Sequence, residues 1–139
     1  MPEIAFRPYE ADDFAAVTRL WQAAGLHPSQ SDTPEGLARK QLRDPELFVL
    51  AIADGRVVGS VMGSYDGRRG WINKLAVLPE CLGQDIGGRL MAEAERRLLM
   101  IGCEKVNLLI ENDNAKVVGY YQRHGYATDD LIFMEKWLA

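Results

Sequence analysis

The spacing of apolar residues predicts a strand and two helices in the first third of the chain. Residues 3–9 have the composition of a short strand that ends in a turn at Pro8. Apolar residues then recur three to four positions apart over residues 12–25, as expected of an amphipathic helix. The segment 26–32 is polar and rich in turn formers, and Thr33 followed by Pro34 supplies an N-cap and a first-turn proline for a second helix.

From residue 47 the pattern is typical of β-structure. Apolar and β-branched residues fill segments 47–53 and 56–65, and Asp54-Gly55 between them is a strong signal for a tight hairpin turn. A second turn over residues 66–70 leads into the segment 71–77. Three consecutive antiparallel strands are therefore expected.

The last part of the chain returns to alternating helices and strands. After Pro79, helical spacing predicts one long helix, with its apolar stripe formed by Ile86, Leu90, Ala94, Leu98 and Ile101. A strand is expected over residues 105–111, a helix over 114–125 and a final strand over 131–138. The complete order is β-α-α-β-β-β-α-β-α-β.

Composition narrows the possible functions. A chain of 139 residues is about the size of one domain, so we expect a single domain over residues 1–139. A formal charge of -4 argues against nucleic-acid binding, and the longest strongly apolar run, residues 47–53, is too short to span a membrane. Cys81 and Cys103 form neither a disulfide framework nor a zinc motif, and no metal is expected. We expect a cytoplasmic protein.

The stretch LAVLPECLGQDIGGRLM, residues 75–91, combines a strand, a glycine loop and a helix start. The first turn of such a helix has unpaired N–H groups at the positive end of the helix dipole, which suits phosphate oxygens. Glycine loops before helices are common, so a purely structural turn is the alternative.

Two segments together resemble the GNAT family of N-acetyltransferases. Residues 75–91 are similar to its strand, Arg/Gln-x-x-Gly-x-Gly/Ala loop and helix, and NAKVVGYYQRHGY, residues 114–126, is similar to its later Tyr-x-x-x-Gly-Phe/Tyr helix. The resemblance covers nearly the whole chain and includes the element order. It implies an α+β domain of the GNAT-like (acyl-CoA N-acyltransferase) fold, with a central mixed, mostly antiparallel sheet flanked by helices.

The resemblance also implies a site for acetyl-CoA as cosubstrate. The strands 71–77 and 105–111 would diverge, and the pantetheine arm would lie in the resulting slot beside the first of them. Asn114 would lie near the arm and Tyr121 near the thioester sulfur. The residues implied for the arm and for the pyrophosphate are Leu75, Ala76 and Val77, and Leu82, Gly83, Gln84, Asp85, Ile86, Gly87 and Gly88, respectively.

The implied reaction is direct attack of a primary amine on the thioester, which needs a base for the ammonium proton and an acid for the leaving thiolate. Tyr121 is the candidate acid, with a packing role as the alternative. Glu111 is the candidate base, and Asp66 is a second one, each with an ordinary solvated carboxylate as the alternative. His27 and His124 have suitable chemistry but lie in polar surroundings, which favours a surface role.

Two residues depart from the family motif. Leu82 stands where Arg or Gln is usual, and Asp85 stands where the first motif glycine is usual. A carboxylate about 6 Å from a phosphate, at an effective dielectric constant near 20, would be repelled by roughly 2 to 3 kcal/mol. The Asp85 side chain could also cap the N–H groups of Gly87 or Gly88, or it could point to solvent. Arg89 could offset the charge or pair with Glu93.

Two functions therefore remain open. The first is an acetyl-CoA-dependent N-acetyltransferase acting on a small molecule, a peptide N-terminus or a lysine. The second is a noncatalytic GNAT-like module that binds a ligand or partner and in which Asp85 has weakened the CoA site. The loops 25–34, 65–70 and 128–130, which by the resemblance shape the acceptor groove, have mixed chemistry and select no acceptor. A homodimer is possible by analogy with the family.

Overall fold

The structure, a computed structural model, describes residues 3–139, with Asn112 described by its backbone alone. It divides into two compact units, of which the first ends at Leu109 and the second covers Ile110–Ala139. The first unit contains β1 (Ile4–Pro8), α1 (Phe14–Ala23), α2 (Pro34–Arg43), β2 (Phe48–Ala53), β3 (Arg56–Tyr65), β4 (Gly70–Val77), α3 (Ile86–Met100) and β5 (Val106–Leu108). The second contains a 3-10 segment, Asn112–Val117, and α4 (Val118–Arg123).

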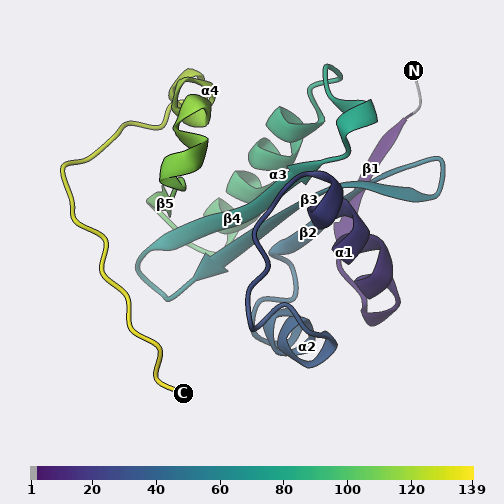
Figure 1. The fold of residues 1–139 in the computed structure, drawn as a ribbon, viewed down its shortest axis with the longest axis horizontal. Coiled ribbons are helices and arrows are strands. Elements are labelled where there is room, and N and C mark those ends of the chain that lie inside the picture. Colours follow the sequence, from purple (N-terminus) through teal and green to yellow (C-terminus); the bar gives the residue numbers. More distant parts are fainter. Residues whose placement is uncertain (1–2) are drawn as a thin grey trace. The chain divides into compact units, whose positions relative to one another are not determined.

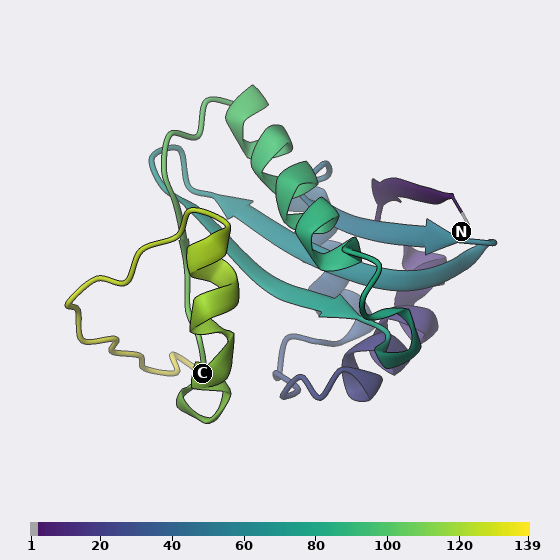
Figure 2. The same cartoon turned by 90° about the horizontal axis from the view of Figure 1, so that it is seen from above.

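One five-stranded sheet organises the first unit. Its strands follow the order β1-β2-β3-β4-β5, and only the β4–β5 pair is parallel. Figures 1 and 2 show α1 and α2 on one face of this sheet and α3 on the other. A mixed, mostly antiparallel sheet flanked by helices is therefore confirmed.

The alternation of side chains in β2 explains why both faces carry helices. Phe48 and Leu50 belong to a core cluster that also includes Tyr9 and, from α1, Trp21. The rings of Phe48 and Tyr9 stack with their centroids 4.5 Å apart. Val49, between them in the strand, points to the opposite face and is also completely buried. A strand buried on both faces reads as a nearly continuous apolar run, as residues 47–53 do.

The helix ends follow local signals in part. Thr33 caps α2 as expected, because its hydroxyl oxygen accepts the N–H of Gly36 at 3.0 Å. The chain enters α1 through a 3-10 turn, Ala11–Asp13, where the Asp13 carboxylate accepts the N–H of Glu10 at 2.8 Å. No helix within residues 3–139 combines the length and apolar character needed to cross a membrane.

The C-terminal elements differ from the sequence prediction. The strand expected over residues 131–138 is not formed, so the predicted order loses its last strand, and the strand expected over 105–111 shrinks to Val106–Leu108. Apolar composition gives residues 131–138 β propensity, but a strand exists only when a neighbour pairs with it, and no strand of the described chain does so. Their large apolar side chains are exposed, as for Ile132 at 90%.

Candidate functional site

The connection between β4 and α3 leaves the start of α3 open. A 3-10 turn, Pro79–Cys81, is followed by an extended Leu82 and then by Gly83, whose φ of +89° places it in the left-handed region. The N–H of Arg89 bonds to the carbonyl of Asp85 at 3.1 Å and so begins the helix. Within residues 3–139 nothing accepts the N–H groups of Ile86, Gly87 and Gly88, as expected for the first turn of a helix without a capping side chain.

The loop between β4 and α3 has fewer free backbone N–H groups than the sequence suggests, because that of Leu82 is already bonded. The N–H of Leu82 is directed inward and donates to the carbonyl of Pro79 at 3.3 Å. The Leu82 side chain is 66% exposed. In this conformation the N–H of Leu82 is therefore not free for a ligand.

Asp85 adopts the conformation that the glycine of the family motif would favour. Its φ is +57° and its ψ is 27°, a left-handed conformation that aspartate tolerates better than most residues. The side chain is exposed and makes no capping hydrogen bond. The possibility that the carboxylate caps Gly87 or Gly88 is therefore wrong, because a left-handed N-cap residue turns its side chain away from the helix donors.

Of the two roles considered for Arg89, pairing with Glu93 is not formed. Its guanidinium lies over the ring of Phe6, 5.3 Å from the ring centroid, and does not pair with Glu93. The Glu93 carboxylate instead accepts Arg97 at 2.8 Å and Arg96, and these bonds, the Arg96 one foremost, lower the pKa of Glu93. The positive charge of Arg89 thus remains near the start of α3.

The parallel pair of strands separates close to this helix start. Pairing between β4 and β5 ends at Ile72 and Leu108, whereas β4 continues to Val77. Beyond Ile72, β4 pairs with β3 alone, as Ala76 with Ser60 and Val77 with Gly59. The edge over Leu75, Ala76 and Val77 therefore has no neighbouring strand within the described chain. That a pantetheine arm lies along this edge stays a prediction.

A β-bulge marks the beginning of this free edge. The register of β3 against β4 shifts between Ser60–Ala76 and Met62–Asn73, so β4 carries one extra residue there. Lys74 lies in the bulge with φ +53°. Its carbonyl accepts the hydroxyl of Ser60 at 2.8 Å, and this hydroxyl in turn accepts the indole N–H of Trp21 at 2.9 Å.

The side chain of Lys74 extends this network to the segment between α1 and α2. Its ammonium donates to the Asp32 carboxylate at 2.8 Å and to the carbonyl of His27 at 3.4 Å, and it lies 4.7 Å from the centroid of the Trp21 ring. The side chains of Lys74 and Asp32 are each only 14% exposed. Sequence reasoning missed this pair, because 42 residues separate its members and each is ordinary in its local context.

The second unit holds the other predicted site residues. Glu111 is exposed and precedes the 3-10 segment, and its carbonyl accepts the N–H of Asn114 at 2.9 Å. Tyr121 lies in α4 between two aromatic neighbours, with centroids 5.2 Å from Tyr120 and 6.0 Å from Tyr126. Burial raises the pKa of the Tyr121 hydroxyl, so it stays protonated at neutral pH, as an acid must.

The remaining candidate bases have structural partners. Asp66 accepts the N–H groups of Arg68 and Arg69 at 2.7 and 2.8 Å in an exposed turn, and these bonds lower its pKa, which makes the carboxylate a poorer proton acceptor. A ring nitrogen of His124 lies 2.9 Å from the carbonyl of Tyr120. Within residues 3–139 no three His, Cys, Asp or Glu side chains form a group able to hold a metal ion.

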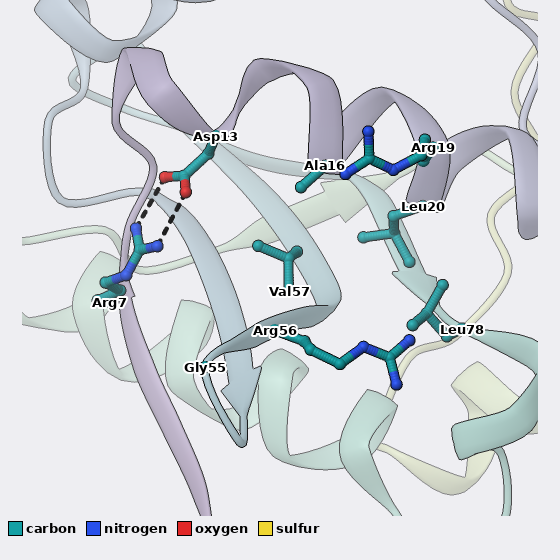
Figure 3. A pocket seen from close by; sticks show the side chains of 9 residues that line it. All are labelled: Arg7, Asp13, Ala16, Arg19, Leu20, Gly55, Arg56, Val57 and Leu78. Atoms are coloured by element: carbon teal, nitrogen blue, oxygen red, sulfur yellow. Dashed lines mark hydrogen bonds and ion pairs between the residues drawn. The ribbon is translucent and has the colours of Figure 1, made fainter.

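A separate pocket lies between α1 and the β2–β3 turn (Figure 3). It is lined by Arg7, Asp13, Ala16, Arg19, Leu20, Gly55, Arg56, Val57 and Leu78. Asp13 binds Arg7 through two bonds of 2.7 and 2.8 Å, and Glu80 lies 3.8 Å from Arg56. Most of the charge in this pocket is thus paired within the protein, and none of its residues belongs to the predicted cofactor site.

Comparison with known sequences identifies the family that this geometry represents. The family model described as Acetyltransferase (GNAT) family matches residues 13–126. An acetyltransferase of Yersinia pestis is 39% identical over 132 residues, covering 95% of this chain and 94% of its own, and an acetyltransferase of Pectobacterium atrosepticum matches equally well. The chain therefore belongs to the GNAT acetyltransferase family. Its activity is that of an acetyl-CoA-dependent N-acetyltransferase.

Solved structures agree on the fold. The PaiA N-acetyltransferase of Thermoplasma acidophilum, in complex with coenzyme A, is similar with a TM-score of 0.83 at 18% identity, over 94% of this chain and 93% of that one. A GNAT family acetyltransferase of Brucella melitensis, in complex with acetyl-CoA, has a TM-score of 0.71 at 24% identity, over 92% and 85% of the two chains. At these identities the likeness establishes the shared fold.

Proposed function

We propose that this protein transfers the acetyl group of acetyl-CoA directly to a primary amine of a small molecule, a peptide N-terminus or a lysine. The observation that carries the proposal is the combination, within the first unit, of uncapped N–H groups at α3 and an unpaired edge over Leu75 to Val77. The first feature suits a pyrophosphate and the second suits the amides of a pantetheine arm.

The residues of the first unit fit acetyl-CoA as a ligand. Ile86, Gly87 and Gly88 offer N–H donors that no group within residues 3–139 accepts, and Gly83 has open space where a side chain would project. The exposed Asp85 leaves these donors accessible, although its charge opposes a phosphate. This accessibility favours the enzyme over the noncatalytic module, because that alternative rests on a blocked or weakened loop.

The proposed chemistry needs a base for the ammonium proton and an acid for the leaving thiolate. The neutral amine attacks the thioester carbon, a C–N bond forms and the C–S bond breaks. Glu111 accepts the proton of the resulting ammonium, and the hydroxyl of Tyr121 gives a proton to the leaving thiolate. The Tyr121 hydroxyl is protonated at neutral pH, as a general acid must be, although its raised pKa makes it a weaker proton donor than an unperturbed tyrosine. The exposure of Glu111 supports only a role through water. Asn114 is proposed to contact the pantetheine arm.

Calorimetric titration with acetyl-CoA, followed by thiol-release assays on a panel of primary amines, tests the proposal. Micromolar binding and turnover with at least one amine are expected. Tyr121→Phe should lower kcat by about a hundredfold or more, the usual contribution of a general acid, while acetyl-CoA still binds. Glu111→Gln tests the base in the same assay. Absence of acetyl-CoA binding would contradict the proposal and favour the noncatalytic module.

Three further expectations belong to this proposal. Residues 1–139 act as one catalytic domain, although the structure divides into two compact units with the boundary between Leu109 and Ile110. The protein works in the cytoplasm, where acetyl-CoA is available, and it forms a homodimer. Light scattering on the purified protein would reveal its oligomeric state, and a monomeric mass would rule out the dimer.

A further inference from the structure

We propose that Lys74 and Asp32 are positioning residues for the acceptor amine: their ion pair holds residues 27–32 against the β4 bulge at the reacting end of the cofactor slot. This inference rests on the proposed function in one respect: it assumes that acetyl-CoA lies along β4 with its thioester end toward Lys74. The ion pair itself is independent of that function.

The position of the pair relative to the reaction follows from the direction of β4. The pyrophosphate donors lie at the start of α3, after Val77 in the chain. A pantetheine arm that leaves this point along the free edge runs back from Val77 toward Leu75, so its thioester end approaches the bulge at Lys74. The residue next to the reacting end is thus also the residue that binds Asp32.

The bulge residue is fixed from three sides. The Lys74 carbonyl is held by the hydroxyl of Ser60, which Trp21 fixes in turn. Its ammonium lies over the Trp21 ring and binds the Asp32 carboxylate. Every group that holds Lys74 is within the first unit, so the bulge is a rigid platform for the segment that it binds.

The segment that carries Asp32 depends on this contact. The same Asp32 oxygen that accepts Lys74 also accepts the N–H of Ser29 at 3.0 Å, and His27 contributes its carbonyl to the Lys74 ammonium. No strand or helix includes residues 27–32. Without Lys74, this segment would lose the link to the sheet that the Asp32 ion pair and the His27 carbonyl provide.

The pair is unlike an ordinary surface ion pair. Both side chains are 14% exposed, so solvent screens the interaction only weakly. Removing one partner leaves the other partly buried without its counter-charge, which favours a rearrangement of the more mobile partner. That partner is the 27–32 segment, because Lys74 belongs to a sheet strand with neighbours in β3.

The chain offers a matched control in Lys40 and Asp44. Their side chains are 13% and 10% exposed, and the Lys40 ammonium binds Asp44 at 2.7 Å and the Ser64 hydroxyl at 2.8 Å. This pair also connects a helix to the sheet, at β3 rather than β4. Lys40→Met therefore reports the cost of losing a half-buried Lys–Asp pair that has no contact with the slot.

The test compares Lys74→Met, Asp32→Asn and their double variant with Lys40→Met. Thiol-release rates are measured with putrescine, tyramine, a free tripeptide N-terminus and Nα-acetyl-lysine, and acetyl-CoA affinity by calorimetry. For any amine that turns over, each single change should raise the acceptor KM about tenfold, because small misplacements near a reacting centre cost one to two powers of ten. Acetyl-CoA affinity should stay within about twofold, and the double variant should be no worse than either single one.

A structural readout separates this inference from the proposed function. Amide hydrogen exchange on the full chain should quicken over residues 27–32 in Lys74→Met and stay unchanged there in Lys40→Met. Unchanged exchange in Lys74→Met would overturn the tether, and an unchanged acceptor KM would overturn its positioning role. If the unaltered protein acetylates none of the amines, the proposed function fails and with it the acceptor role, while the exchange result still decides the tether.

Discussion

The N-terminal ends of α2 and α3 differ in how their first N–H groups are satisfied. At α2, Thr33 is extended with φ -111°, and its hydroxyl oxygen accepts the N–H of Gly36. Pro34 at the first position removes a further donor. At α3, Asp85 is left-handed, and its carboxylate accepts no helix N–H. The protein thus caps one helix start with its own side chain and leaves the other without a side-chain cap.

The comparison teaches that residue type alone does not decide capping. Aspartate is as good an N-cap as threonine in general, yet only the residue with extended backbone angles caps here. Asp13 supports the same rule as the N-cap residue of α1, because it has helical angles, φ -83° and ψ -5°, and its side chain caps no N–H of that helix. Its carboxylate instead accepts the N–H of Glu10 and binds Arg7.

The largest effect is expected from Asp85→Gly. Removing the charge beside the open helix start should tighten acetyl-CoA binding by about thirtyfold to a hundredfold at low salt, the equivalent of roughly 2 to 3 kcal/mol. Calorimetric titration measures the change. Asp54→Gly is the control, because Asp54 is also exposed with φ +52° but lies in the β2–β3 turn.

A second variant separates charge from backbone at the same position. Asp85→Asn keeps a residue that tolerates the left-handed conformation and removes the charge. It should reproduce most of the gain seen with Asp85→Gly. A gain confined to the glycine variant would show instead that backbone freedom of the loop limits binding.

The next effect concerns the ion pair between Arg7 and Asp13 before α1. The two bonds from Arg7 lower the pKa of Asp13 below its ordinary value of 3.8. The folded state therefore gains stability from this ionised carboxylate above about that pH, and loses it as the pH falls through the lowered pKa. Asp13→Asn should cost about 1 to 2 kcal/mol at pH 7, with Arg7 partly screened by solvent, and should flatten the decline in stability below pH 4. Urea unfolding at pH 7 and pH 3 checks both effects.

Thr33→Ala should have a smaller and purely structural effect. Loss of the cap at α2 should lower the free energy of unfolding by about 1 kcal/mol, and Thr33→Ser should restore most of it. Acetyl-CoA affinity should not change in either variant. An altered affinity in Thr33→Ala would mean that the two helix starts are coupled.

The smallest effect is in the salt dependence. Because Asp85 is exposed, its repulsion of a phosphate should be screened as ionic strength rises. The affinity ratio between Asp85→Gly and the unaltered protein should fall by about threefold between 0.05 and 0.5 M salt. A ratio independent of salt would indicate a steric rather than an electrostatic origin.

Local sequence signals predict most of the first unit. The strands and the hairpin at Asp54-Gly55, the capped start of α2 and the amphipathic α3 follow from local signals of turn, cap and period. The glycine loop after β4 predicted the open helix start for the same reason, since N–H groups in a first turn lack partners by geometry. These features depend on neighbours in the chain, so a pattern can predict them.

Only the tertiary structure decided the features that depend on distant partners. Whether residues 131–138 form a strand depends on a pairing edge, and which way the Asp85 side chain points depends on a backbone angle that its neighbours do not fix. The pair of Lys74 and Asp32 forms because the β4 bulge turns one lysine toward a segment 42 residues away. Such contacts have no local signature, because the fold alone makes their two halves neighbours.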